Sequence, residues 1–105
     1  MKPSFEQTLV AVWTQALVGD AKEVRLGNDS FPVRRTRKQG LRQVDFHLEG
    51  KEFRGLEQNP HTKSRWARLA RSGQKIMQFL SEGRYVANVA DGKLYRYRPW
   101  EPKAE

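Results

Sequence analysis

Residues 31–48 read FPVRRTRKQGLRQVDFHL, and this stretch decides the fold. Two strand-like runs, 31–38 and 41–48, flank the dipeptide Gln39-Gly40, which predicts a β-hairpin with a two-residue loop. A three-residue loop would set Val33 against Asp45, so the hydrophobic pattern selects the shorter one. The predicted cross-strand pairs are Val33 with Phe46, Phe31 with Leu48 and Arg34 with Asp45.

Upstream of this hairpin, the N-terminal segment has the spacing of an amphipathic helix. Ser4 is a suitable N-cap, and Gln7 stands where a capping box places its second residue. Gly19-Asp20 marks the end, so the helix is predicted over 4–18. Its apolar side chains fall on one face. They are Phe5, Leu9, Val12, Trp13, Ala16 and Leu17.

Downstream of the hairpin, tight turns recur and favour antiparallel pairing. Asp91-Gly92 is the strongest of them and predicts a hairpin of 84–90 with 93–98. It pairs Val89 with Leu94, Asn88 with Tyr95 and Val86 with Tyr97. Further strands are predicted at 22–26, 52–57 and 75–80, and a short second helix at 64–73. The order α-β-β-β-β-α-β-β-β predicts an α+β fold, with an antiparallel sheet of six to seven strands, a long N-terminal helix and a short central helix.

The composition sets the limits of this fold. The chain has 105 residues, which is enough for one core, so we expect a single domain over 1–99 and a flexible tail over 100–105. There is no Cys, which excludes disulfides and thiolate metal ligands. No apolar run approaches the roughly 18 residues of a membrane span, so we expect a cytoplasmic protein without a membrane partner.

The net charge of +8 is concentrated in one part of the chain. Residues 31–75 hold twelve Lys and Arg against four Asp and Glu, whereas the flanks 1–30 and 76–105 carry net charges of −1 and +1. A localised positive field attracts polyanions. The alternative interpretation is a basic surface that serves only solubility.

Two groups of basic residues form the candidate site. One surrounds the hairpin tip, and the other lies on the loop and exposed face of the second predicted helix, whose amide N–H groups suit a phosphate. We expect phosphate contacts with nucleic acid from Arg34, Arg37, Lys38, Arg42, Lys63, Arg65, Arg68 and Arg71.

The second half of the chain resembles a family. The sequence Gly-Leu-Glu-Gln-Asn-Pro at 55–60, Trp66 in the following helix and Met-Gln-Phe at 77–79 carry the resemblance. It is to small bacterial proteins of unknown function in which such a loop enters a short Trp-bearing helix and a closing hairpin. The resemblance implies a self-contained domain and brings no activity with it.

An enzymatic reading has little support in the sequence. His47 and Asp45 share the polar face of a strand with Glu49, which suits acid–base work or a metal but is also the ordinary solvent side of a sheet. His61 lies in a loop. No glycine-rich phosphate loop occurs. We therefore expect no catalytic residue, no metal and no cofactor.

Two alternatives stay open. The protein is a protein–protein interaction module or homodimer if Tyr95, Tyr97 and the sheet edges form a contact surface. The loop Gln58-Asn59-Pro60 either binds a small ligand or phosphate or, as we favour, has the structural role of ending the strand and capping the next helix.

Overall fold

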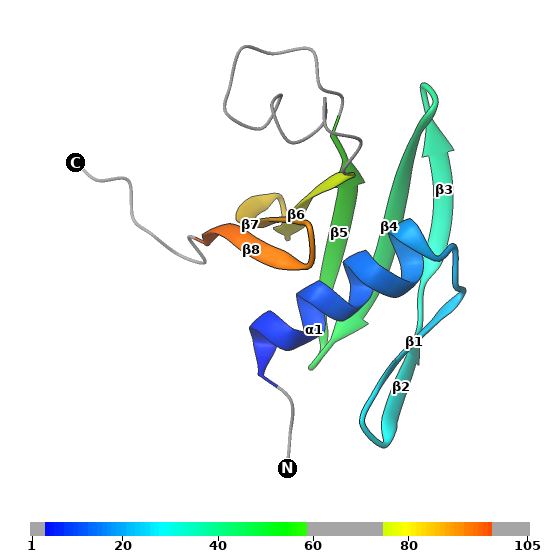
Figure 1. The fold of residues 1–105 in the computed structure, drawn as a ribbon, viewed down its shortest axis with the longest axis vertical. Helices are drawn as coiled ribbons and strands as arrows, with labels where there is room; N and C mark the ends of the chain where they lie inside the picture. Colours follow the sequence, from blue (N-terminus) through cyan, green and yellow to red (C-terminus); the bar gives the residue numbers. More distant parts are fainter. Residues whose placement is uncertain (1–3, 59–74, 98–105) are drawn as a thin grey trace, which may run out of the picture.

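The chain forms an N-terminal helix followed by antiparallel strands, in a computed structural model that describes residues 4–58 and 75–97 (Figure 1). The helical part comprises α1 (Phe5–Val12) and a π-helical continuation (Trp13–Val18). The strands are β1 (Glu23–Leu26), β2 (Asp29–Pro32), β3 (Arg34–Lys38), β4 (Leu41–Leu48), β5 (Lys51–Glu57), β6 (Ile76–Ser81), β7 (Arg84–Ala90) and β8 (Lys93–Tyr97). The predicted α+β class is confirmed.

The strands divide into two sheets. β3 to β8 pair in sequence order as a six-stranded antiparallel meander, and β1 and β2 form a separate two-stranded sheet. Helix α1 crosses one face of the meander, in front of β4 and β5 (Figure 1). The helix predicted at 64–73 and the tail at 100–105 lie outside the described residues.

The N-terminal helix begins where the sequence predicts. The Gln7 backbone N–H donates to the Ser4 hydroxyl (3.0 Å), and the Ser4 N–H donates to the Gln7 side chain (2.8 Å). The capping box is therefore present and satisfies amide groups that the first turn leaves unpaired. At the other end, Asp20 adopts a left-handed conformation, with φ of +57°, and ends the helical run.

Four turns of the meander share one conformation. Both central residues have positive φ, as a type I′ turn requires, and the second is always glycine. These turns are Gln39-Gly40, Glu49-Gly50, Glu82-Gly83 and Asp91-Gly92. Because the type I′ twist matches the twist of the flanking strands, these short sequences favour four of the five strand pairings of the meander; the fifth, β5 with β6, joins strands that residues 58–75 separate.

The strand predicted at 31–38 is divided in two. The register Arg34 opposite Asp45 is confirmed, but β3 begins only at Arg34, and Phe31 pairs with Val24 of β1 instead of with Leu48. Pro32 explains the division, because it has no N–H to donate to a ladder. The predicted Phe31–Leu48 and Val33–Phe46 pairs are therefore absent from the ladder.

The register of the last hairpin also differs in part from the predicted one. Val89 pairs with Leu94 as predicted, but a bulge follows, so that Asn88 stands opposite Arg96 and Ala87 opposite Tyr97. The predicted pairs of Asn88 with Tyr95 and of Val86 with Tyr97 are wrong. One extra residue in β8 shifts the register beyond the bulge.

The core lies between α1 and the meander. Leu9, Val12, Ala16 and Leu17 are fully buried from the helical side, as their spacing predicts. On the sheet, the Phe46 ring stacks on Phe53 (centroids 5.4 Å apart) and meets Phe79 edge-on (6.1 Å). Among the residues that the structure describes, no helix is both long enough and apolar enough to cross a membrane.

Candidate nucleic-acid interface

The β3–β4 hairpin carries the candidate site at one edge of the meander. β3 is the terminal strand of this sheet, and its side chains alternate between two faces. Arg35 lies opposite Val44, a fully buried core residue, so Arg35 and Arg37 belong to the helix side. Arg34 and Lys38 point to the opposite side. The hairpin therefore presents cations on both of its faces.

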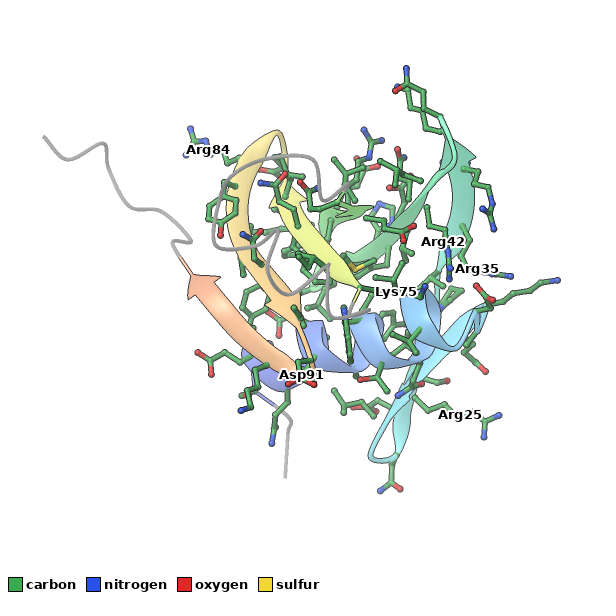
Figure 2. All side chains as sticks on the ribbon, turned by 45° about the horizontal axis from the view of Figure 1, so that its top comes forward. Arg25, Arg35, Arg42, Lys75, Arg84 and Asp91 are labelled. Carbon is green, nitrogen blue, oxygen red and sulfur yellow. The ribbon has the colours of Figure 1, made fainter. Side chains whose placement is uncertain are left out.

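Two of the arginines form hydrogen bonds and ion pairs within the protein. The Arg42 Nη1 donates to the Leu17 carbonyl and to Asp20 Oδ1 (3.0 Å), and the Arg35 Nη1 donates to the same Asp20 oxygen (3.3 Å). Figure 2 shows both arginine side chains beside the C-terminal end of the helix. A cation at this end satisfies a carbonyl that the helix leaves unpaired and offsets its negative dipole.

Glu57 holds Arg42 from the other direction. The Glu57 Oε1 accepts the Arg42 backbone N–H at 2.9 Å and lies 3.6 Å from the Arg42 Nε. Both side chains are mostly buried, with exposed fractions of 19% for Arg42 and 16% for Glu57. Arg42, which the sequence analysis assigned to anion binding, is thus an internal bridge between the helix and the sheet.

The remaining three hairpin cations have a different environment. Arg34, Arg37 and Lys38 are exposed, and none forms an ion pair with another residue in the ranges 4–58 and 75–97. Asp45, the cross-strand neighbour of Arg34, is held instead by Arg54 Nε at 3.1 Å.

The charges of the hairpin therefore separate into two sets. Asp20 and Glu57 offset the charges of Arg35 and Arg42, whereas Arg37 stands directly opposite Arg42 and has no acidic partner among the residues that the structure describes. Like charges that face each other across strands destabilise a hairpin unless something compensates them. Three positive charges on this edge face solvent and can receive an anion.

The other predicted site residues cannot be placed on this surface. Lys63, Arg65, Arg68 and Arg71 lie outside the described residues. Of the loop at 58–60, Gln58 is described, and its backbone N–H donates to the Ile76 carbonyl (2.9 Å) while its amide donates to the Leu56 carbonyl (3.1 Å). These contacts place Gln58 at the end of the strand, whereas Asn59 and Pro60 lie outside the described residues.

The acid–base alternative centres on His47. Its side chain is exposed opposite Glu52, and a groove of about 300 Å³ runs beside both residues. Asp45 also lines this groove, but its carboxylate already accepts hydrogen bonds from Arg54 and Gln43. In the described part of the chain, no group of three or more His, Asp or Glu side chains is placed to hold a metal ion.

Sequence reasoning did not anticipate the role of Asp20. Its position after Gly19 indicated only a helix end, yet its carboxylate binds two arginines that follow 15 and 22 residues later. The available signal was an acidic residue at a helix C-terminus, where the dipole favours a cation. A positive partner nearby offsets the unfavourable interaction of a negative side chain with this end of the helix.

Comparisons with known proteins add no assignment to this geometry. No protein-family model, no curated protein and no solved structure matches the chain. The resemblance to small bacterial proteins therefore stays a prediction.

Proposed function

We propose that the protein is a non-enzymatic, cytoplasmic binding protein for nucleic acid, which it holds through phosphate contacts. The observation that carries the proposal is the separation of charges on the β3–β4 hairpin. Arg34, Arg37 and Lys38 are exposed without an acidic partner in the described ranges, while Arg35 and Arg42 are occupied internally. Arginine and lysine in such positions bind phosphate and release the counterions of the polyanion.

The edge position of β3 also supports an anionic partner. An open strand edge invites pairing with another strand, and charged side chains on the edge counteract this. If two copies paired through β3, the cations Arg34, Arg37 and Lys38 of both copies would face one another. The repulsion disfavours a homodimer through this edge and leaves the surface available to an oppositely charged ligand.

The part of the site outside the described residues belongs to the same proposal. Lys63, Arg65, Arg68 and Arg71 are proposed as additional phosphate contacts, and Arg42 is reassigned to a structural role as the internal bridge between the helix and the sheet. Three contacts from the hairpin alone give a salt dependence, log Kobs against log salt, with a slope of about −2.7 on duplex DNA. That slope corresponds to a loss of affinity of about 40-fold between 50 and 200 mM salt.

Fluorescence anisotropy with labelled DNA and RNA across a salt series tests the proposal. The informative variant combines Arg34→Gln, Arg37→Gln and Lys38→Gln, which should weaken binding and make the salt slope shallower by about 2.7. The matched control combines Arg25→Gln, Arg84→Gln and Lys93→Gln, which removes the same formal charge from exposed positions elsewhere. It should retain most of the affinity and nearly the whole slope.

Three results would contradict the proposal. One is the absence of binding to any nucleic acid at 50 mM salt. The second is an equal loss of affinity in the hairpin variant and the control, which would mean that bulk charge alone attracts the ligand. Binding to poly-glutamate as tight as to DNA would also count against nucleic acid, because it would show that any anionic polymer suffices.

A further inference from the structure

The tip of the β3–β4 hairpin leaves the sheet as a two-stranded ribbon. The pairing of β4 with β5 stops at Gln43 and Leu56, whereas β3 and β4 remain paired as far as Lys38 and Leu41. The Arg42 N–H donates to the Glu57 carboxylate in place of a β5 carbonyl. Within the residues that the structure describes, no strand pairs with β4 on its β5 side beyond this point.

The projecting part of the hairpin has dimensions that fit a groove of a nucleic-acid duplex. Gly40 lies three positions before Gln43, and at about 3.4 Å per residue the turn projects about 10 Å beyond the last three-stranded position. Figure 1 shows this turn at the end of the sheet, away from α1. The major groove of B-form DNA is about 8.5 Å deep and about 12 Å wide, and it admits a two-stranded β-ribbon.

The side chains of the ribbon suit a ligand with phosphates on both sides. Thr36 to Gly40 are all exposed, with Arg37 on one face and Lys38 on the other. A groove presents a phosphate backbone on each wall, so one cation reaches each wall. Gln39 stands at the apex, where its amide can donate to and accept from a base edge such as that of adenine.

The composition of the ribbon argues against a single-stranded ligand. Proteins that bind single strands usually stack the bases on aromatic side chains, and residues 34–43 contain no Phe, Tyr or Trp. Duplex RNA fits less well, because its major groove is deep and narrow. Resting on the proposed function, we infer that the β3–β4 hairpin inserts its tip into the major groove of duplex DNA, with Arg37 and Lys38 on opposite phosphate walls and Gln39 at the bases.

Three probes of equal sequence test this inference by anisotropy at one salt concentration. They are a DNA duplex of about 20 base pairs, one of its single strands and the corresponding RNA duplex. The DNA duplex should bind at least about fivefold more tightly than either of the others. A fourth probe is the DNA duplex with 7-deazapurines, which keeps every phosphate but lacks the N7 acceptors of the major groove. It should bind about fivefold more weakly than the unmodified duplex.

The variant Gln39→Gly tests whether Gln39 makes the contact with the base edges. Gln39 has φ of +56°, a conformation that glycine adopts without strain, so the hairpin should fold normally. The variant should lose the preference for the unmodified duplex over the 7-deazapurine duplex. The control Glu82→Gly removes a side chain at the same position of the β6–β7 turn and should keep that preference.

The outcomes separate the inference from the proposed function. If the single strand or the RNA duplex binds as tightly as the DNA duplex, insertion into the major groove is wrong while nucleic-acid binding stands. Equal binding of the unmodified and 7-deazapurine duplexes, or a preference that survives Gln39→Gly, overturns the inference in the same way. Failure of every probe to bind instead overturns the proposed function.

Discussion

Replacing Arg42 by methionine should cost the protein stability and leave its ligand binding nearly unchanged. Methionine retains much of the aliphatic volume but removes every guanidinium contact. The change leaves the Leu17 carbonyl and the Asp20 carboxylate without this donor, and leaves Glu57 with only its backbone contact to residue 42. Arg42→Met therefore tests whether this arginine is an internal bridge rather than part of the binding surface.

The magnitude follows from the burial of the partners. Breaking a fully buried ion pair by removing one member costs about 3–5 kcal/mol. The pair of Arg42 and Glu57 is mostly rather than fully buried, at 19% and 16% exposure, and the Asp20 side chain is 60% exposed. The contact of Arg42 with the exposed Asp20 carboxylate adds less than about 1 kcal/mol to this loss. We expect the free energy of unfolding to fall by about 2–3 kcal/mol.

Urea denaturation followed by tryptophan fluorescence measures this loss, with an unchanged m-value as evidence that the two end states are comparable. The control is Arg37→Met, the exposed residue directly opposite Arg42. It should change stability by less than about 0.5 kcal/mol. The double variant with Glu57→Gln should lose less than the sum of the two single variants, because the two side chains interact.

The reasoning fails if Arg42→Met costs less than about 0.5 kcal/mol, since the bridge would then contribute no more than a surface residue does. It also fails if Arg42→Met, measured where the protein is fully folded, weakens nucleic-acid binding as much as Arg37→Met. In that case Arg42 would contact the ligand, as its place in the basic segment first indicated.

Two further substitutions test the packing of the sheet and the start of the helix. Gly55→Ala should destabilise the protein by about 1–3 kcal/mol in the same assay, because a Cβ there would lie 2.8 Å from the fully buried side chain of Met77. The double variant with Met77→Ala should lose less stability than the sum of the two single variants. Strict additivity of the two losses would rule out the clash. Ser4→Ala should cost about 0.5–2 kcal/mol and Ser4→Asp almost nothing, and equal losses in the two variants would mean that the cap hydrogen bond contributes little.

Much of the fold depends on local information and could be predicted. The capping residue Ser4 and the apolar spacing of the helix act over a few residues, as do the glycines that follow Gln39 and Asp91. The divided strand and the shifted register of the last hairpin could not be predicted in this way. Pro32 has no N–H for a ladder with β4, but the strand that pairs with Phe31 instead, β1, comes from another part of the chain. A bulge likewise depends on how the packed sheet twists.

The sequence by itself determined an N-terminal helix, antiparallel hairpins and a basic segment, because caps, turns and charge counts depend on neighbours along the chain. It could not distinguish one arginine of the hairpin from another. Only the tertiary structure brings Asp20 and Glu57 to Arg42 and leaves Arg37 exposed across the ladder. The physical reason is that the role of a charge is set by the partners and solvent around it, and folding supplies these from distant parts of the chain.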